Sequence, residues 1–269
     1  MKIILIGDIV GKAGRKAVQK EIQNLRKQHN ACFVIANGEN MAGGAGLSES
    51  GCRDLHKSGV DVITSGDHVW DQKDFIQQIT RMPFCLRPAN MHTNLPGKGY
   101  AIYNIPIGGK IAVINLLTTV FMKIESSNAF EYADRIVEEV SKQTSTIFLD
   151  IHGEATSEKI AMGRYLEGRV TCVFGTHTHV QTADEQVFPG GTAYITDLGM
   201  VGSDISILGR KIAPVVKRFS TGIPSRFLVE DDQITIHGAV VEFDGDSGRA
   251  TNIERIKLSI KDGVLNALP

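Results

Sequence analysis

Short apolar runs with β-branched residues recur along this chain, and several of them end directly at a polar or ionisable residue. Residues 3–6, 32–36 and 60–64 are runs of this kind, and segments with helix-like apolar stripes separate them. Buried strands appear in sequences as continuous apolar segments, and strands that alternate with helices indicate a largely parallel core. We therefore expect an α/β protein.

The middle and the end of the chain have a different pattern. Residues 100–105 and 110–116 flank Gly108-Gly109, which predicts a β-hairpin. Asn128 with Glu131 three residues later resembles a capping box and predicts the start of a helix. Further strands are expected at 145–151, 170–174, 192–196, 233–243 and 252–260, and helices at 48–58 and 156–166. Long loops are usually functional or mobile, and we expect residues 199–222 to form a solvated surface loop.

Composition limits the class of protein. The chain has 269 residues, of which 42% are hydrophobic and 22% charged, which is ordinary for a globular protein with a sizeable core. We find no internal repeat or linker and expect one domain over residues 1–269. The net charge of −1 provides no basic field that would attract nucleic acid or an anionic membrane. A nucleotide substrate would therefore be captured locally.

Two further features bear on the cellular location. The apolar start of the chain is too short for a signal peptide, and no apolar stretch is long enough to span a bilayer. The cysteines are far apart in the sequence and form no CxxC pair, so we expect them to be reduced, buried and structural. They are Cys32, Cys52, Cys85 and Cys172. These features predict a cytoplasmic protein with no membrane partner.

Two histidines, His177 and His179, follow the apolar run at 170–174. In extended backbone, residues two apart point the same way, so both imidazoles can face one pocket. Imidazole is the commonest metal-ligating side chain. Taken alone, however, the pair is equally consistent with two unrelated histidines on a solvated strand end.

Other strand ends also carry side chains that bind metals or transfer protons. They are Asp8, Glu39 and Asn40, Asp67 and His68, and His152. Each has a simple alternative: Asp8 as a helix cap, Asn40 as a turn residue, or His152 as a buried histidine bonded to backbone. The carboxyl ends of strands in an open α/β sheet meet at one edge, where ligand sites gather. Eight such residues at five strand ends together indicate a metal site.

The types of side chain limit which metals fit. Thiolates are absent from this set, which excludes a structural zinc site of the cysteine type. Imidazole with carboxylate oxygen suits Fe, Mn, Zn or Co. The set is too large for one ion, whereas two ions bridged by one carboxylate would use it fully. Two-metal sites with ions about 3.5–4 Å apart serve in-line phosphoryl displacement.

The pattern of these residues resembles the calcineurin-like metallophosphoesterases, and within them the YmdB-type branch. The resemblance runs from the first strand to about residue 210 and is carried by several short segments. They are Gly7-Asp8-Ile9-Val10-Gly11 with Gly14-Arg15, Asn37-Gly38-Glu39-Asn40, Gly66-Asp67-His68-Val69-Trp70-Asp71, Arg87-Pro88-Ala89-Asn90, Thr156-Ser157-Glu158-Lys159, Gly175-Thr176-His177-Thr178-His179 and Asp197-Leu198-Gly199-Met200.

The resemblance implies a four-layer α/β/β/α sandwich and two metal ions per chain, iron first, with manganese or zinc as alternatives. One ion would be held by Asp8, Glu39 and His179. The other would be held by Glu39, Asn40, Asp67, His152 and His177. A hydroxide shared by both cations would attack the phosphorus, and His68 would donate a proton to the leaving oxygen.

The substrate that the resemblance implies is a 2',3'-cyclic nucleotide, opened to the 3'-nucleotide; an RNA-derived phosphodiester belongs to the same class. No residue is assigned to substrate binding, and the roles of Arg87 and Asn90 are open between lining a pocket and shaping a turn. The resemblance and the length of the segment 199–222 also favour a homo-dimer or tetramer.

Two positions depart from the superfamily pattern. The first strand ends in Asp8-Ile9-Val10, without the histidine of the usual Asp-x-His, as in the YmdB-type branch. The family's Gly-Asn-His is here Gly66-Asp67-His68. The carboxylate of Asp67 should still bind a metal, but it adds negative charge and removes an NH₂ donor that could contact a substrate phosphate.

Two alternatives come from other functional classes. Gly7, Gly11 and Gly14 could belong to a dinucleotide-binding or P-loop motif, but the spacing fits neither pattern and leaves the histidines unexplained. The second alternative is a regulatory scaffold that the metal stabilises, with weak or no phosphoesterase activity. A phosphatase or nuclease of the same fold is a third reading, because one fold serves several chemistries.

Overall fold

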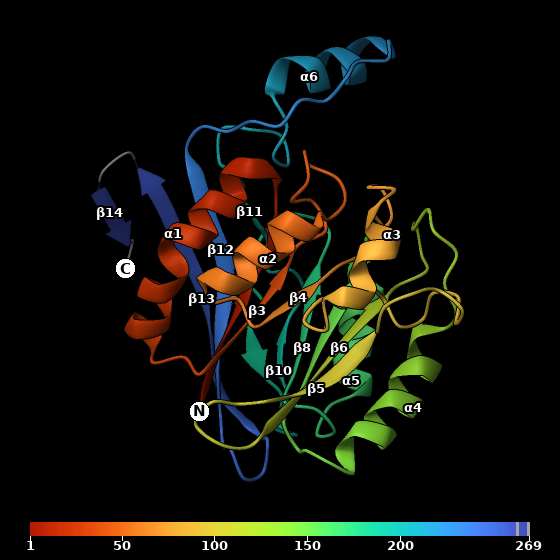
Figure 1. The fold of residues 1–269 in the computed structure, drawn as a ribbon, viewed down its shortest axis with the longest axis vertical. Coiled ribbons are helices and arrows are strands. Elements are labelled where there is room, and N and C mark those ends of the chain that lie inside the picture. Colours follow the sequence, from red (N-terminus) through yellow and green to blue (C-terminus); the bar gives the residue numbers. More distant parts are fainter. Residues whose placement is uncertain (262–263, 268–269) are drawn as a thin grey trace.

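The computed structural model describes residues 1–261 and 264–267, and it contains two β-sheets that pack face to face (Figure 1). The first sheet has the strand order β14-β13-β12-β1-β3-β4, with β11 paired to β12 and to β2. Its strands are β1 (Lys2–Ile6), β2 (Asp8–Ile9), β3 (Phe33–Asn37), β4 (Val62–Thr64), β11 (Met200–Ser203), β12 (Ile234–Phe243), β13 (Ala250–Lys261) and β14 (Val264–Ala267). Strands β1, β3 and β4 are parallel, and β12 joins them antiparallel to β1.

The second sheet has the strand order β5-β6-β7-β8-β10-β9. Its strands are β5 (Tyr100–Asn104), β6 (Lys110–Leu117), β7 (Ile147–His152), β8 (Cys172–Thr176), β9 (Gln186–Val187) and β10 (Ala193–Ile195). The hairpin of β5 and β6 is antiparallel, whereas β6, β7, β8 and β10 run parallel. The expected hairpin and the parallel core are both confirmed.

Helices cover the outer face of each sheet (Figure 1). They are α1 (Gly11–His29), α2 (Glu49–Ser58), the short α3 (Phe75–Gln78) followed by a 3₁₀ turn at Ile79–Arg81, α4 (Ala129–Ser141) and α5 (Thr156–Tyr165). A further helix, α6 (Ile212–Thr221), lies outside these layers. Helices α1 and α2 pack on the first sheet, whereas α4 and α5 pack on the second. Helix α4 begins as expected, because the Asn128 side chain accepts hydrogen bonds from the N–H groups of Phe130 and Glu131.

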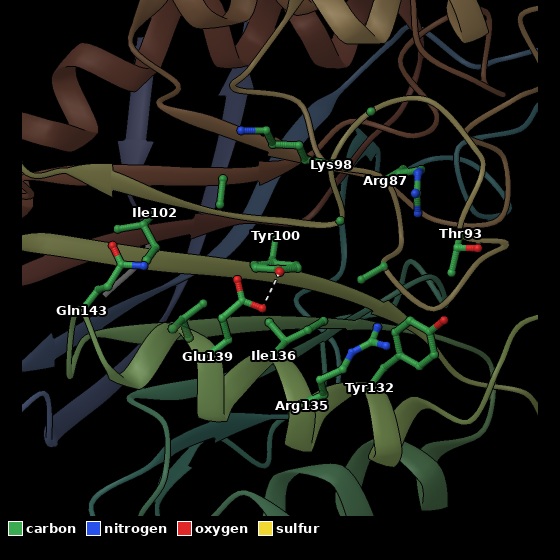
Figure 2. A pocket seen from close by; sticks show the side chains of 15 residues that line it. Arg87, Thr93, Lys98, Tyr100, Ile102, Tyr132, Arg135, Ile136, Glu139 and Gln143 are labelled. Atoms are coloured by element: carbon green, nitrogen blue, oxygen red, sulfur yellow. Dashed lines mark hydrogen bonds between the residues drawn. The ribbon is translucent and has the colours of Figure 1, made fainter.

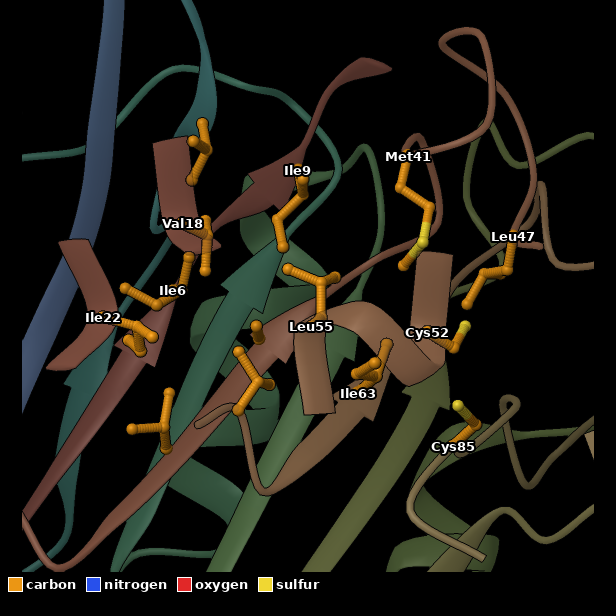
Figure 3. Packing of buried hydrophobic residues seen from close by; sticks show 14 of the residues in the cluster. Ile6, Ile9, Val18, Ile22, Met41, Leu47, Cys52, Leu55, Ile63 and Cys85 are labelled. Carbon is orange, nitrogen blue, oxygen red and sulfur yellow. The ribbon is translucent and has the colours of Figure 1, made fainter. Parts of the chain in front are cut away.

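The alternation of side chains along the strands explains the four layers. In β1, Ile3 and Leu5 face the second sheet, whereas Ile4 and Ile6 face α1 and α2. Figure 3 shows this outer cluster, in which Leu55 of α2 lies close to the strands. Separate apolar clusters therefore fill the space between the sheets and the space under each helical layer. This confirms the expected α/β/β/α sandwich.

One expectation for the chain was wrong. Residues 199–222 contain strand β11 and helix α6 as well as loop. The helix was not apparent because Pro214 lies inside it, but proline is tolerated in a first turn, where its missing N–H would have no helical partner. Most of its apolar side chains are exposed, and α6 projects from the body of the molecule (Figure 1).

A smaller expectation, that the cysteines are buried and unpaired, is confirmed. All four cysteines are buried and free. Among the described residues, no helix combines the length and the apolarity that crossing a membrane requires. The carboxyl ends of β3, β4, β7 and β8 all lead into segments with ionisable residues, and these residues come together as follows.

Candidate metal centre

The first sheet contributes residues from the ends of three strands. Asp8 forms strand β2 directly after β1, and its N–H donates to the carbonyl of Gly199 at 3.0 Å. Glu39 and Asn40 lie in the turn after β3, where the Glu39 N–H donates to Asn37 Oδ1 at 3.0 Å. Asp67 follows β4. All four residues are at most 8% exposed.

The second sheet contributes three histidines. His152 is the last residue of β7 and is fully buried. His177 and His179 follow β8 with φ angles of 102° and 65°, which are unusual for residues other than glycine. The His177 imidazole lies beside His152 and Asp67, whereas the His179 imidazole lies beside Asn40 and Asp8. The positive φ angles show that the segment is a strained turn and not an extended strand.

Four of these side chains form a compact cluster of potential ligands. One ligand atom from each of Glu39, Asp67, His152 and His177 lies within 4.8 Å of the others. The Nε2 atom of His152 is 3.3 Å from Glu39 Oε1 and 3.2 Å from Asp67 Oδ1. The Nδ1 atom of His177 is 3.1 Å from His152 Nε2 and 3.5 Å from Asp67 Oδ1. Both sheets therefore contribute potential metal ligands to one cluster.

Gly66 explains how the cluster can be so compact. A Cβ atom on this residue would lie 2.2 Å from His152 Nε2 and 2.3 Å from Glu39 Oε2. Such contacts are too short for any side chain, so only glycine allows the backbone before Asp67 to approach the two ligands. We conclude that packing requires glycine at position 66.

A second group of donors adjoins the first. His179 Nε2 is 3.1 Å from Asn40 Oδ1 and 4.0 Å from Asp8 Oδ1. The other Asp8 oxygen, Oδ2, accepts the N–H of His177 at 3.1 Å. Oδ1 of Asp8 is buried and has no hydrogen-bond partner. Because buried carboxylate oxygens are rarely left without a partner, this atom suggests a cation ligand, and the mixed O and N donors around it fit one.

The ionisable side chains of the cluster affect one another's protonation. Burial raises the pKa of Asp8 well above its ordinary value. Burial also acts against the charged form of His152, but the Glu39 charge and the Asp67 hydrogen bond outweigh it and raise the pKa of His152. For Glu39, burial would raise the pKa, but the charge and hydrogen bond of His152 lower it. In the absence of a metal, a proton on His152 thus offsets part of the negative charge.

A hydrogen-bond relay orients His152. Its Nδ1 atom is 2.8 Å from Thr176 Oγ1, and the Thr176 hydroxyl donates to Asp150 Oδ1 at 2.7 Å. Because the Thr176 hydroxyl donates its proton to Asp150, its oxygen must accept a hydrogen bond from Nδ1–H of His152. The other ring nitrogen of His152, Nε2, therefore faces the cluster. Asp150 also accepts from Thr64 at 2.5 Å and from Asn37 at 3.3 Å, and burial raises its pKa to about 6. Neither Asp150 nor Thr176 was predicted from the sequence to have this role.

A buried ion pair supports the turn that carries His177 and His179. Lys159 Nζ of α5 lies 2.9 Å from Asp197 Oδ2, and both side chains are fully buried. Lys159 also donates to the carbonyl of Thr176 at 3.2 Å, and Asp197 Oδ2 accepts the N–H of Thr178 at 3.1 Å. Both residues lie in segments that carried the resemblance, but no role was assigned to them.

His68 lies at the rim of the cluster. Its side chain is 38% exposed, its N–H donates to Glu39 Oε2 at 3.3 Å, and its Nδ1 is 2.7 Å from Asp71 Oδ2. The remaining ring nitrogen, Nε2, has no partner within residues 1–261. Asn90 has a different role, because its side chain bonds the backbone of Leu117 and Ser127. It therefore shapes the loop, one of the two roles left open for it.

Comparison with known proteins places this architecture in a family. The model of the family described as YmdB-like protein matches residues 4–256, which is nearly the whole chain. This chain belongs to the YmdB-like family. The resemblance inferred from the strand-end residues is thereby confirmed.

Relatives and solved structures of the YmdB-like chain cover almost its full length. The 2',3'-cyclic-nucleotide 2'-phosphodiesterase of Bacillus subtilis (strain 168) is 44% identical over 259 residues, which are 96% of this chain and 97% of that protein. The crystal structure of a novel phosphatase from Mycoplasma pneumoniae matches with a TM-score of 0.90 and 32% identity, over 96% of this chain and 93% of the other. A hypothetical protein from Thermus thermophilus matches with a TM-score of 0.89 and 34% identity, over 96% of this chain and 99% of the other.

Proposed function

We propose that this chain is a phosphoric diester hydrolase with two metal ions, which opens 2',3'-cyclic nucleotides to 3'-nucleotides. The observation that carries the proposal is the compact cluster of Glu39, Asp67, His152 and His177, with a second group of donors beside it. The name of the Bacillus subtilis relative supports the reaction and the substrate class. Residues 1–269 would act as one metallophosphoesterase domain.

The donors divide naturally into two groups around Glu39. Asp67, His152 and His177 would hold one ion, and Asp8 and His179 would hold the other. The 3.1 Å contact between Asn40 and His179 favours placing the Asn40 oxygen with Asp8, which modifies the ligand set that the resemblance implies. Iron is the first candidate for both ions, with manganese or zinc as alternatives. When bound, the ions would supply charge stabilisation for the phosphoryl oxygens and a water nucleophile near neutral pH.

The protein's own residues would supply positioning and a proton. Hydrolysis of the cyclic diester consumes one water, breaks the bond between phosphorus and the 2' oxygen, and leaves the phosphate on the 3' oxygen. His68 would give the departing 2' oxygen its proton from Nε2, because Nδ1 is held by Asp71. The hydrogen bond from the His68 N–H to Glu39 Oε2 would keep this imidazole beside the reacting phosphate.

Metal analysis of the gently purified protein, alongside hydrolysis of 2',3'-cAMP, tests the proposal. We expect about two Fe, Mn or Zn per chain and release of 3'-AMP. Two metals without turnover on 2',3'-cAMP or bis-p-nitrophenyl phosphate would overturn the enzymatic assignment and favour a scaffold that the metal stabilises. No metal after reconstitution would overturn the assignment of all the ligands.

A further inference from the structure

A pocket of about 570 Å³ lies outside the metal centre, between the edge strand β5 and helix α4, and Figure 2 shows the side chains around it. Its cationic side chains do not converge, since Lys98 and Arg87 point in different directions (Figure 2). Arg87 donates instead to three carbonyls of its own loop, those of Pro88, Leu95 and Pro96. Arg87 therefore shapes this loop, and we assign no ligand to the pocket.

A tight turn at residues 207–210, in contrast, contacts the second group of donors in the metal centre. Ile207 and Arg210 exchange two backbone hydrogen bonds, both of 2.9 Å, and the two residues between them, Leu208 and Gly209, have φ angles of 50° and 82°. Positive φ angles at both central residues are typical of a type I′ hairpin turn, a conformation that leucine rarely adopts. We call these four residues the Leu208 turn, and helix α6 begins two residues after it.

The carbonyl of Leu208 lies 3.3 Å from Nδ1 of His179. Because a carbonyl can only accept a hydrogen bond, this contact favours the tautomer of His179 that carries its hydrogen on Nδ1. In that tautomer Nε2 can bind a cation, and Nε2 is the atom that lies 3.1 Å from Asn40 Oδ1 and 4.0 Å from Asp8 Oδ1. Histidines that bind metals usually donate their other N–H to a partner of this kind.

The side chain of Arg210 acts on Asn40 through one carbonyl in the loop after β3. The guanidinium donates to the carbonyl of Gly44 at 2.5 Å, and Nδ2 of Asn40 donates to the same carbonyl at 3.3 Å. Since the carbonyl can accept only from the NH₂ group of the amide, it turns the other end, Oδ1, toward His179. Arg210 thus fixes the carbonyl that orients the Asn40 side chain.

Glycines allow the Leu208 turn to approach the metal centre so closely. A Cβ atom on Gly44 would lie 2.2 Å from Nη1 of Arg210, and one on Gly209 would lie 2.8 Å from Cγ1 of Val10, two residues after Asp8. Within the described residues, the Arg210 side chain makes no ion pair, and its hydrogen bonds are to the carbonyls of residues 43 and 44. Its contacts therefore fit a role in holding this loop.

The two contacts of the Leu208 turn act on neighbouring atoms. With the His179 hydrogen on Nδ1 and the Asn40 amide directed at Gly44, His179 Nε2 and Asn40 Oδ1 are both acceptors, and 3.1 Å separates them. Two acceptors at this distance repel one another, whereas a cation bound to both would stabilise them. The hydrogen bonds and ion pairs described for Asp67 and His152 do not involve this turn.

We propose that Leu208 and Arg210 are positioning residues that control the affinity for one of the two metal ions. Through His179 and Asn40 they set the affinity for the ion beside Asp8 and leave the affinity for the other ion unchanged. This inference rests on the proposed function, because it requires two ions per chain. It makes the Leu208 turn an outer support of one half of the metal centre.

Metal titration of the full-length protein tests the role of Arg210. The protein is stripped of metal and titrated with Mn²⁺ against a competing chelator, and the bound ions per chain are counted. Wild type should bind about two ions, whereas Arg210→Met should bind one of them about 10- to 100-fold more weakly, as is typical when an outer partner of a metal ligand is lost. Lys211→Met removes the same charge from the next, exposed position and should match wild type.

Two substitutions at one position test the carbonyl of Leu208. Leu208→Pro imposes a φ angle of about −65°, which is incompatible with the turn, and it should weaken the same ion as Arg210→Met. Leu208→Gly keeps the carbonyl and adopts a positive φ angle without strain, so it should bind both ions as wild type does. Equal effects of the two substitutions would contradict a role for the direction of this carbonyl.

The Asn40→Ala variant shows whether Arg210 acts through Asn40. In this background Arg210→Met should weaken the ion no further, because the amide that it orients is absent, whereas additive losses would overturn the proposal. Unchanged binding in Arg210→Met, or equal weakening of both ions, would overturn it while leaving the two-metal function intact. Fewer than two ions in wild type would overturn the proposed function and this inference together.

Discussion

Asp71 Oδ2 lies 2.7 Å from Nδ1 of His68, three residues earlier in the chain. A carboxylate in this position selects the ring nitrogen that carries the hydrogen and fixes the direction of the imidazole. The other nitrogen of His68 then lies on the side of the ring away from Asp71, and the side chain is 38% exposed. In the proposed reaction, this nitrogen would donate the proton to the leaving oxygen. The pair of His68 and Asp71 thus holds an imidazole in a fixed direction while keeping it accessible to solvent, which the buried histidines of the cluster are not.

We predict that Asp71→Asn lowers kcat on 2',3'-cAMP about tenfold and changes KM little, because it removes the charge that orients His68. His68→Gln should lower kcat by about two to four orders of magnitude. Steady-state kinetics with metal content measured on the same samples would check both. Asp74→Asn removes a nearby exposed carboxylate and should behave as wild type. A change confined to KM in Asp71→Asn would contradict an orienting role.

Asp67 gives a second prediction, because the family pattern has asparagine there. Its carboxylate contacts His152 and His177, and although burial opposes ionisation, hydrogen bonds from these histidines lower the pKa of Asp67. Asp67→Asn should weaken metal binding, since it removes one negative charge, and should raise kcat/KM of the fully loaded enzyme through a new NH₂ donor to phosphate. Metal titration and kinetics at saturating metal would separate the two effects.

Asp54→Asn, on the exposed face of α2, makes the same change of charge far from the strand ends and is the control. Tighter metal binding in Asp67→Asn would show that the additional carboxylate does not act as a ligand.

Most of the fold, and the clustering of the candidate ligands, could be predicted because both depend on short-range patterns. Side chains alternate in direction along β1, so Ile4 and Ile6 face the helices, whereas Ile3 and Leu5 face the other sheet. The two-residue period of a strand is enough to predict this. The candidate ligands lie at strand ends, and the carboxyl ends of neighbouring parallel strands meet at one edge. His177 and His179 were expected to lie in extended backbone, but both have positive φ angles and belong to a strained turn.

The supporting residues could not be predicted in this way. Asp150 and Thr176 lie within apolar strands, and only the packing of the two sheets brings Asp150 near Asn37 and Thr64. Lys159 appears in the sequence as an ordinary helix lysine, because nothing local shows that α5 turns it toward a buried aspartate. Helix α6 was missed because Pro214 lies in its first turn, where proline is tolerated although it breaks a helix at interior positions.

The pair Lys159–Asp197 gives a prediction about stability. Lys159→Met should destabilise the protein by about 3–5 kcal/mol, because it leaves Asp197 as an uncompensated buried charge. Urea unfolding would measure this loss. The double variant Lys159→Met/Asp197→Leu should recover much of the stability, since no buried charge remains. Lys142→Met removes an exposed lysine at the end of α4 and should change stability by less than about 0.5 kcal/mol.

The double variant also distinguishes packing from support of the metal centre. Asp197 Oδ2 accepts the N–H of Thr178, between the two histidines, so the stable double variant should still bind metal more weakly than wild type. Metal affinity equal to wild type in the double variant would show that the ion pair serves only the folding of α5 onto the sheet.

His237 of β12 provides a dependence of stability on pH that does not involve the metal ligands. Its Nδ1 is 3.0 Å from the carbonyl of Met200, and burial lowers the pKa of His237 below its ordinary value of 6.5. The unfolded chain therefore binds the proton more tightly, so the contribution is fully present above 6.5 and is lost as pH falls toward the folded-state pKa. The variant His237→Asn keeps a donor for the Met200 carbonyl but cannot titrate. As pH falls from about 7.5 to about 5.5, the unfolding free energy of wild type should therefore decrease relative to that of the variant. Urea midpoints at both pH values measure it, with His92→Asn in an exposed loop as the control, and a pH-independent difference would contradict the role of His237.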